Sequence, residues 1–276
     1  MQWHRDIEVL TPLFNRGAYQ DTPELRVPSI RGMVRWWFRA LGGTPDDEKT
    51  AFGGMKGFGH EHRNEVVASR LVFRVSAFQA QRAKPDPLTL PHKSGGPGSP
   101  QAAFAPGATF HLEVFTRFGG LPADIERKVT NALEVWLLLG ALGLRANRSG
   151  GNIWPAGDGA PQTPSDLRKR LDELGCHWPV YLAGLPADST LDELRAAATD
   201  TLKGMPEVFG QAGGGRIASK VKFKIVRLDD RLRLLIFAPD QDTLEKARNA
   251  LKGRRSKPET WVRIEDEPPP AAQAPP

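Results

Sequence analysis

The feature that most constrains the fold is an eight-residue pattern that occurs twice in the chain. Residues 68–75 read Ala-Ser-Arg-Leu-Val-Phe-Arg-Val, and residues 218–225 read Ala-Ser-Lys-Val-Lys-Phe-Lys-Ile. A Phe-Gly pair precedes each copy, at Phe52-Gly53 and at Phe209-Gly210. A pattern repeated at a long interval is typical of duplication of a whole structural unit, so the two halves should share one order of helices and strands.

Hydrophobic periodicity and capping residues predict the same order of elements in both halves. The first half is expected to hold strands at 7–14, 66–75, 109–117 and 153–154, with helices at 29–41 and 124–142. The second half is expected to hold strands at 178–183, 220–228, 232–238 and 261–264, with helices at 191–202 and 243–251. This β-α-β-β-α-β order is that of the ferredoxin-like unit. The sequence therefore predicts an α+β protein with two tandem ferredoxin-like, RRM-like domains.

The length of 276 residues suits two domains of this kind. We expect the first at 1–158 and the second at 159–265, followed by a disordered Pro/Ala-rich tail at 266–276. Residues 79–106 contain six prolines and no periodicity, which predicts a long loop inserted in the first domain. We expect that loop to be mobile in the isolated chain.

Composition excludes several classes of protein. The sequence has no run of 18 apolar residues, which is about the length needed to cross a membrane. The N-terminus lacks the apolar core of a secretory signal. A single cysteine, Cys176, allows neither an internal disulfide nor a cysteine-based metal site. The net charge is +6, and residues 1–155 supply most of it, with 19 Lys and Arg against 14 Asp and Glu. We expect a cytoplasmic protein with no membrane contact and an acidic partner.

An arginine stripe is the strongest candidate binding feature. Residues 25–45 contain no acid, and on a helical wheel Arg31, Arg35 and Arg39 follow one narrow side of an otherwise apolar helix. Ser29 is the expected N-cap, Gly32 would let a backbone approach, and Arg26 precedes the helix. The pattern favours a site for phosphate groups near the helix N-terminus over the alternative, an ordinary solvated face paired with acids from elsewhere in the chain.

Two further segments are rich in glycine and basic residues. The first, residues 139–152, offers Gly143, Arg145, Asn147, Arg148 and Gly150, and no acid occurs between Glu134 and Asp158. It lacks the Gly-Lys-Ser/Thr ending of a nucleotide-hydrolysing loop, so it indicates a phosphodiester contact or a flexible connection between domains. The second segment offers Arg216, Lys220 and Lys222, which could contact RNA or form the solvated face of a strand.

Catalytic and metal-binding patterns are sparse. His60 and His62 lack a third ligand nearby, and Asp86 is an isolated carboxylate in the proline-rich loop. The remaining histidines form no motif with a Ser or Cys nucleophile. The sequence predicts no catalytic residue, no metal and no cofactor.

The segment from Leu25 to Leu41, with Pro-Ser-Ile-Arg-Gly and Arg-Trp-Trp-Phe-Arg-Ala-Leu, and the glycine-rich run from Leu139 to Gly150 resemble the RAMP superfamily of CRISPR proteins. Within it, the chain is most similar to the family of first subunits of the Cmr, type III-B, effector complex. The resemblance implies two ferredoxin-like domains and a place at one end of a guide-RNA filament, near the guide 3′ end. It implies contacts with guide RNA, target RNA and other RAMP subunits, through Arg26, Ser29, Arg31, Arg35, Arg39, Gly143, Arg145 and Arg148.

Two other functions remain open at this point. A metal-independent RAMP endoribonuclease that processes guide-RNA precursors would need a general acid or base such as His60 or His62. A protein-interaction module would instead use the arginines to meet acidic neighbours.

Overall fold

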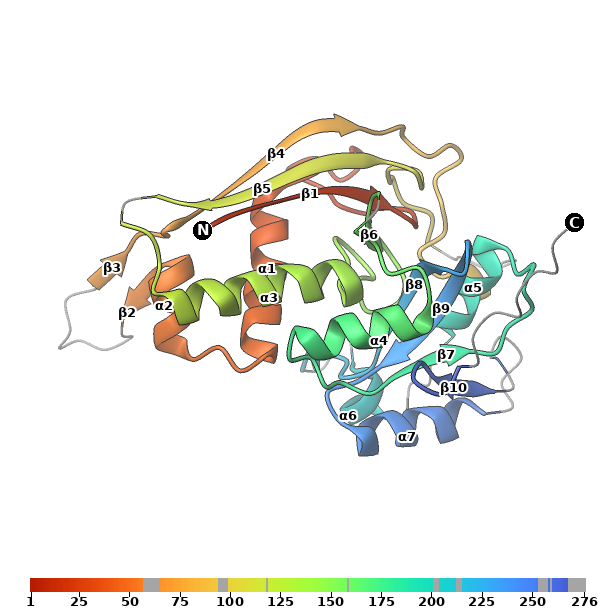
Figure 1. Cartoon of the computed structure of the whole chain (residues 1–276). Helices are drawn as coiled ribbons and strands as arrows, with labels where there is room; N and C mark the ends of the chain where they lie inside the picture. The colour runs from red at the N-terminus through yellow and green to blue at the C-terminus, as the bar shows by residue number, and fades with distance from the viewer. Residues whose placement is uncertain are drawn as a thin grey trace, which may run out of the picture.

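The computed structural model in Figure 1 describes residues 1–56, 65–93, 99–117, 119–157, 159–200, 204–211, 215–252, 258 and 260–267. The predicted tail lies outside these residues from 268 onward. Among the described residues, no helix is long and apolar enough to cross a membrane.

The first sheet contains β1 (Gln2–Val9), β4 (Leu71–Gln79), β5 (Thr109–Thr116) and β6 (Ile153–Pro155), in the order β4-β5-β1-β6. Neighbouring strands are antiparallel. The helices α1 (Val27–Ala40) and α3 (Ala123–Leu139) cover one face, and the other face is open at the top of Figure 1. Alternation places Ile7, Leu112 and Val114 in the core beneath the sheet.

The second sheet repeats this arrangement. It contains β7 (Val180–Ala183), β8 (Lys222–Leu228), β9 (Arg231–Phe237) and β10 (Trp261–Arg263), in the order β10-β7-β9-β8. The helices α5 (Leu191–Thr199) and α7 (Gln241–Leu251) pack on one face of it. Numbered within each unit, both sheets have the strand order 2-3-1-4 of the ferredoxin-like fold, which confirms the predicted fold class.

The remaining elements connect or extend the two units. They are α2 (Pro45–Phe52), β2 (Gly54–Lys56), β3 (Glu65–Val67), the 3₁₀ turn η1 (Pro91–Lys93), α4 (Pro164–Glu173) and α6 (Pro206–Phe209). Along the sequence, α4 follows the last strand of the first sheet and precedes the first strand of the second. In space it packs beside α3 (Figure 1).

Three predicted boundaries at the start of the chain are wrong. The first strand begins at Gln2, five residues earlier than predicted, and ends at Val9, before Pro12, which has no N–H for a sheet ladder. The apolar residues after it are buried, and Leu13 forms only an isolated bridge with Phe104. Helix α1 begins at Val27, so Ser29 is not its N-cap and its hydroxyl instead donates to Asn15 Oδ1 at 3.4 Å. A proline fits the first helical turn, where its missing N–H costs nothing.

The repeated sequence pattern corresponds to a repeated structure. A helix ends at each Phe-Gly pair, where Gly53 and Gly210 have φ values of 73° and 76°. A Cβ at Gly53 would lie 2.6 Å from the backbone nitrogen of Ser69, just before β4, and a Cβ at Gly210 would lie 2.7 Å from that of Ser219, just before β8. These serines also match, since Ser69 donates to the carbonyl of Leu71 and Ser219 to that of Val221. The two units therefore share the same glycine–serine contact between helix end and strand start, although β2 and β3 lie between the two residues in the first unit.

One core extends through both units. The face of the second sheet that turns away from α5 and α7 packs against the first domain, through residues that include Val226, Leu228 and Phe237. Trp37 from α1 lies 5.1 Å from Trp178 and 6.5 Å from Phe237, measured between ring centroids. Because these apolar contacts join the two sheets, the domains are held as one body.

The proline-rich insertion also joins the domains. Its described part is irregular, as predicted, but Thr89 and Pro91 are buried. Arg195 of α5 donates to the carbonyl of Leu88 at 2.6 Å, and the His92 ring lies 2.9 Å from the hydroxyl of Thr199. These contacts attach the part of the insertion around Leu88 and His92 to the second domain.

A buried carboxylate on α3 connects this helix to β1 and α4. Glu134 lies on α3 and accepts hydrogen bonds from Trp3 Nε1 at 2.8 Å and Arg5 Nη2 at 2.6 Å. Its second oxygen accepts from Arg170 Nη2 of α4 at 3.3 Å. All three donors serve one buried acid, so its loss would leave the indole N–H unpaired in the core.

We expect Glu134→Ala to lower the free energy of unfolding by about 2 kcal/mol, because hydrogen bonds to a charged group are lost. Urea denaturation measures this change. The matched control is Glu173→Ala, which removes an exposed acid from the same Arg170 and should cost less than about 1 kcal/mol. Equal costs for the two variants would contradict the structural importance of Glu134.

Candidate nucleic-acid interface

The arginine stripe lies on α1 as predicted, but α2 supplies an acid for part of it. Arg35 donates to Glu48 Oε1 through Nε at 2.8 Å and Nη2 at 2.5 Å, and Arg39 Nη1 donates to the same oxygen at 2.9 Å. Glu48 is buried. Two guanidinium groups share one carboxylate, so this part of the stripe retains one net positive charge.

The N-terminal half of the helix is less neutralised. Arg31 donates to the carbonyl of Phe52, while its Nε has no hydrogen-bond partner. Burial and the neighbouring Arg35 lower the pKa of Arg31. Arg26 is exposed, and its Nε lies 4.0 Å from Glu24 Oε1. Gly32 is exposed, and a Cβ added there would meet nothing within 4 Å, so the backbone is open to a ligand at this point.

The glycine-rich loop has a packing role that the sequence did not reveal. Gly143 has a φ of 77°, and a Cβ there would lie 2.5 Å from the carbonyl oxygen of Phe14. That same carbonyl accepts from Leu144 N at 2.9 Å. Gly150 is buried, with Leu144 O 2.5 Å from its hypothetical Cβ. The glycines therefore let the loop lie against the segment before α1, and the burial of Gly150 argues against the exposed position expected for it from the sequence.

Arg148 is a second correction to the predicted RNA-facing set. Its guanidinium is buried and donates to Phe209 O at 2.8 Å, Val221 O at 3.0 Å and Ser219 Oγ at 3.1 Å. Burial lowers its pKa to about 10. Arg148 thus fixes the glycine-rich loop of the first domain to the second domain, and it cannot project towards solvent.

The backbone beside Arg148 extends this connection along β8. Phe223 N donates to Asn147 O at 3.2 Å, and Ser149 N donates to Phe223 O at 3.2 Å, which forms a short parallel bridge. Ile225 N donates to Asn152 Oδ1 at 2.7 Å. The loop is therefore paired with β8 rather than being a flexible connection.

Two lysines on one side of β8, the predicted Lys222 and also Lys224, point towards the first domain. Lys222 is half-buried, donates to Asn147 Oδ1 at 2.8 Å and lies 4.3 Å from the ring centroid of Trp36 on α1. Burial and Arg148 lower its pKa to about 8. Lys224, which shares this side of the strand, is fully buried and donates to Leu137 O near the C-terminus of α3, where the helix dipole favours a cation.

The two other residues predicted in this region, Arg216 and Lys220, are exposed. They precede β8, whose start is beside Asn147. Neither is fixed by the junction contacts described above.

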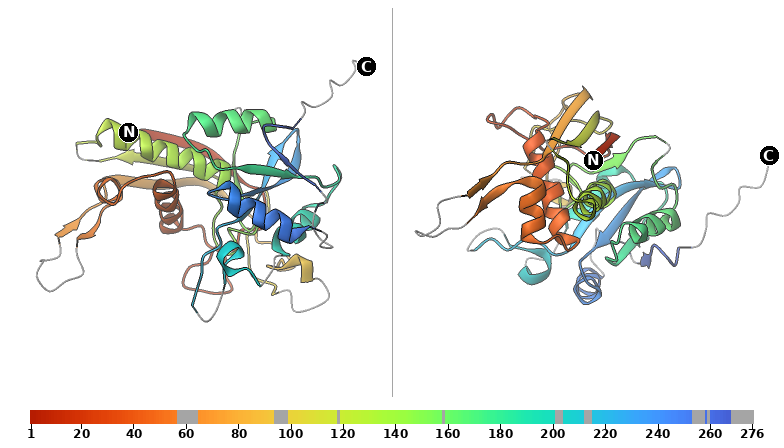
Figure 2. Two further views of the ribbon diagram at one scale, coloured as in Figure 1. Left: turned by 90° about the horizontal axis from the view of Figure 1, so that it is seen from below. Right: turned by 60° about the vertical axis from the view of Figure 1, so that its left-hand side comes forward.

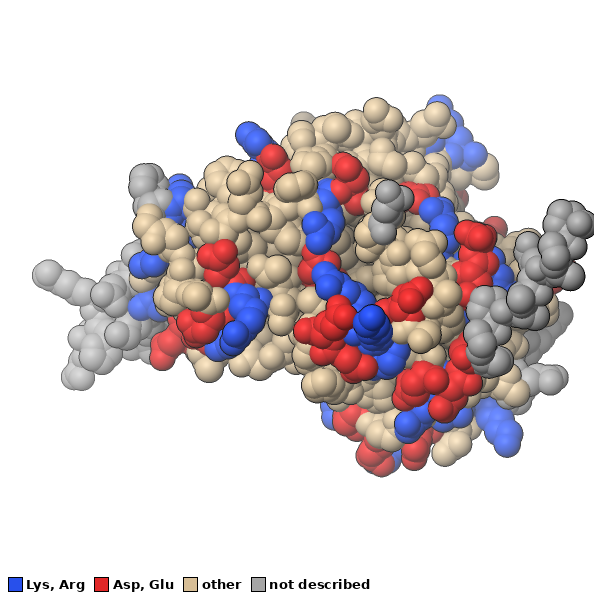
Figure 3. Space-filling view, in the orientation of Figure 1, with Lys and Arg blue, Asp and Glu red and all other residues tan. Residues whose placement is uncertain are grey.

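We call Arg145, Arg148 and Lys222 the junction cations. Arg145 is exposed, with a backbone φ of 62°, and its pKa is lowered by partial burial. Each of the three pKa values is lowered, and Arg148 and Lys222 are further affected by a neighbouring cation of the set. Within the described part of the chain, none of them has a carboxylate partner. The α3–α4 face differs, because Lys and Arg alternate there with Asp and Glu (Figure 3).

Of the candidate catalytic residues, only Asp86 lies in the part of the chain that the structure describes. His60 and His62 lie outside the described residues. Asp86 is paired with Arg82 at 3.3 Å. Among the residues that the structure describes, no group of three or more His, Cys, Asp or Glu side chains is arranged to hold a metal ion.

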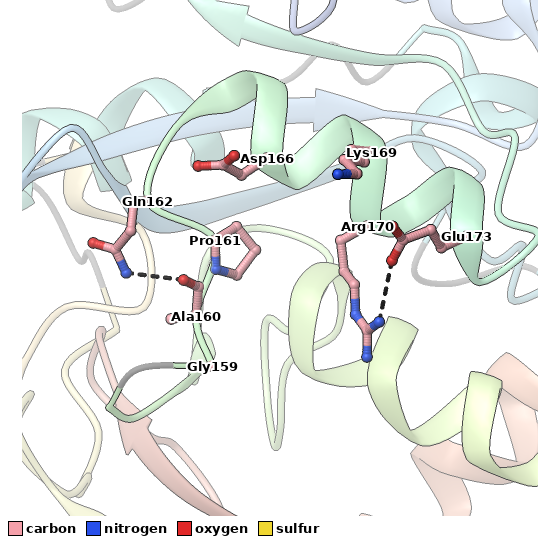
Figure 4. Close-up of a pocket in the computed structure, with 8 residues that line it drawn as sticks. All are labelled: Gly159, Ala160, Pro161, Gln162, Asp166, Lys169, Arg170 and Glu173. Carbon is pink, nitrogen blue, oxygen red and sulfur yellow. Dashed lines mark hydrogen bonds and ion pairs between the residues drawn. The ribbon is translucent and has the colours of Figure 1, made fainter.

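The cavities lie apart from the predicted site residues. One cavity of about 220 Å³ lies between residues 159–162 and α4, where Lys169 and Arg170 alternate with Asp166 and Glu173 (Figure 4). A larger one of about 610 Å³ lies between the end of β4 and residues 105–108. Neither is lined by a residue of the predicted RNA-facing set.

A pair of glycine variants tests the packing role of the loop. Gly143→Ala should destabilise the protein by roughly 1–3 kcal/mol, because it strains a left-handed backbone and crowds the Phe14 carbonyl. Gly32→Ala should instead stabilise it by about 0.5–1 kcal/mol, since Gly32 is helical and its surroundings are open. Thermal unfolding measures both, and a stable Gly143→Ala protein would contradict the close contact.

Comparisons with known proteins agree with the fold. Over 38 residues, 14% of this chain, it is 55% identical to the CRISPR system Cmr subunit Cmr1-2 of Pyrococcus furiosus; the match spans 20% of that relative. The crystal structure of Cmr1 from Pyrococcus furiosus in its apo form has a TM-score of 0.55 at 18% identity, covering 87% of this chain and 89% of that one.

A chain in a cryo-EM structure of the type III-B Cmr-beta complex, bound to cognate target RNA and AMPPnP, has a TM-score of 0.52 at 10% identity. The alignment covers 90% of this chain and 99% of that one. At these identities the two structures establish similarity of fold. The family model of the RAMP superfamily matches residues 6–154, more than half of the sequence, and the chain therefore belongs to the RAMP superfamily.

Proposed function

We propose that this chain is an RNA-binding subunit of a type III-B CRISPR effector complex. Membership of the RAMP superfamily and the similarity of fold to Cmr1 support the assignment to such a complex. In this proposal the chain caps the guide-RNA filament near the guide 3′ end and helps to hold the guide–target duplex. Its partners are guide RNA, target RNA and neighbouring RAMP subunits.

The observation that carries the RNA-binding part is the uncompensated charge of the junction cations. Among the described residues, Arg145, Arg148 and Lys222 have no carboxylate partner, and their lowered pKa values mean that positive charge is costly there. A bound anion would offset this cost. Arg145 and Lys222 are accessible enough to contact it, whereas Arg148 contributes its field from within the protein.

The chemistry of these groups fits a phosphate backbone better than a base edge. Arg145 and Lys222 offer cationic donors, and Gly32 offers an open stretch of helix backbone beside Trp36. Such contacts position a nucleic acid without reading its sequence. In a guide-RNA complex, base pairing with the guide supplies the sequence specificity. The proposal assigns no catalytic step to this chain.

A charge-removal experiment tests this role. We expect Arg145→Ala combined with Lys222→Met to weaken binding of single-stranded RNA by roughly tenfold or more. The slope of log K against log salt should flatten by about 1.4, because two phosphate contacts are lost at about 0.7 each. Fluorescence anisotropy over a range of salt concentrations measures both quantities.

The control removes the same charge elsewhere. Lys169→Ala combined with Lys246→Ala changes two exposed lysines on α4 and α7. It should leave the salt slope within error of the unmodified protein, and circular dichroism verifies that both proteins are folded. If the two double variants bind RNA equally well, the proposed interface is wrong.

The low pKa of Lys222 makes RNA binding sensitive to pH. Its amine is charged below about pH 8 in the free protein and loses its proton above that value. Phosphate favours the charged form, so binding above pH 8 must take up a proton. We therefore expect the affinity to fall by roughly tenfold between pH 7 and pH 9.

Lys222→Arg is the matched control for the pH dependence, because arginine stays charged throughout this range. The RNA should contain only adenosine and cytidine, whose bases do not titrate here. The variant should show a much flatter pH profile than the unmodified protein. The same decline in both proteins would exclude Lys222 as the titrating group.

A further inference from the structure

The loop between β1 and α1 is ordered by backbone hydrogen bonds and carries an exposed aromatic side chain. Glu24 N donates to Asn15 O at 2.8 Å, and Arg16 and Pro23 form an antiparallel bridge, so the loop closes like a small hairpin. Within it, Arg16 Nη1 donates to Gln20 O at 3.1 Å. Tyr19 lies in this turn with 74% of its surface exposed.

This exposure is unusual within the molecule. Four large hydrophobic side chains are exposed among the described residues, and Tyr19 is the most exposed of them. Two of the others, Leu144 and Ile217, lie in the glycine-rich loop and in the turn before β8, next to predicted RNA-facing residues. Scattered apolar residues need no explanation, but Leu144 adjoins Arg145 of the proposed interface, and the backbone of Leu144 contacts the base of the Tyr19 loop.

The base of the loop is joined directly to the proposed site. The carbonyl of Phe14 accepts from Leu144 N at 2.9 Å, and Asn15 Oδ1 accepts from Ser29 of α1. Asn15 is buried, and its amide nitrogen has no hydrogen-bond partner. The loop therefore starts between Arg145 and the first turn of α1. Figure 2 (left) shows it projecting from the side of the molecule opposite α4.

The charges around Tyr19 favour a nucleobase as its partner. Residues 15–26 carry two arginines and two acids, so the loop itself is neutral. The excess positive charge lies at its base, on Arg145 and the other junction cations. A nucleotide has this same division, because its base is a flat π surface and its phosphate is the anionic part.

We propose that Tyr19 is a stacking platform for an unpaired base, so that the interface takes single-stranded RNA at this end of the molecule. The inference rests on the proposed RNA-binding function. A phosphate of the same strand lies towards Arg145 and Lys222, while the base stacks on the phenol ring. Duplex RNA would not use this contact, because its bases already stack on one another.

The test compares Tyr19→Ala and Tyr19→Phe in the full-length chain, with single-stranded and fully paired RNA as probes. Tyr19→Ala should bind single-stranded RNA about tenfold more weakly, in line with the contribution of one stacked base. Its affinity for duplex RNA should be unchanged. Tyr19→Phe keeps the ring and should bind both RNAs like the unmodified protein.

A fluorescent base provides a direct readout of stacking. A single-stranded RNA with 2-aminopurine at successive positions should be quenched at one position by the unmodified protein and by Tyr19→Phe, but not by Tyr19→Ala. Equal quenching by all three proteins would overturn the stacking role. Because Tyr19 is exposed, Tyr19→Ala should fold normally, which circular dichroism verifies.

The results distinguish failure of the Tyr19 stacking role from failure of the proposed RNA-binding function. If Arg145→Ala with Lys222→Met loses RNA but Tyr19→Ala does not, the interface stands and the stacking role fails. If neither variant loses RNA, both proposals fail. If Tyr19→Ala keeps its RNA affinity but no longer associates with purified neighbouring RAMP subunits, Tyr19 is a protein contact and the inference is wrong.

Discussion

The arrangement of the two domains depends on the buried guanidinium of Arg148. It comes from the glycine-rich loop of the first domain and reaches carbonyls of Phe209 and Val221 in the second. A buried arginine is tolerated only where its donors are satisfied, so these contacts fix how the loop meets β8. The pairing of this loop with β8 also places Asn147 beside Lys222, whose amine lies over the ring of Trp36 on α1.

The internal duplication helps to explain this contact. In the second unit, Arg148 binds the carbonyl of Phe209 at the end of α6; in the first, Arg31 binds the carbonyl of Phe52 at the end of α2. Both carbonyls belong to the repeated Phe-Gly pair, where the last groups of a helix lack partners within the helix. The duplicated unit thus presents one arginine-binding position twice: the first holds α1 against α2, and the second joins the domains.

The sequence predicts the element order and the fold because strand alternation and helical periodicity are local properties. It also locates the stripe of Arg31, Arg35 and Arg39 on one side of α1. It could not reveal that Glu48 neutralises part of that stripe, since the acid belongs to another helix. Nor could it reveal the direction of Arg148 or Lys222. Left-handed residues turn the glycine-rich loop inward, and β8 is covered on both faces, which alternation alone cannot distinguish from a half-exposed strand.

Folding brings the positive charges of the junction cations close together, although burial and mutual repulsion disfavour their charged forms. The apolar core around Trp37 and Phe237 and the hydrogen bonds of Arg148 hold Lys222 near Arg148 despite their repulsion. A strand of RNA would then meet groups already in position, so little ordering would be needed on binding. Since Arg145 comes from the first domain and Lys222 from the second, a strand bound to both would contact two domains at once. The same contacts that join the domains would in this way prepare the surface for RNA.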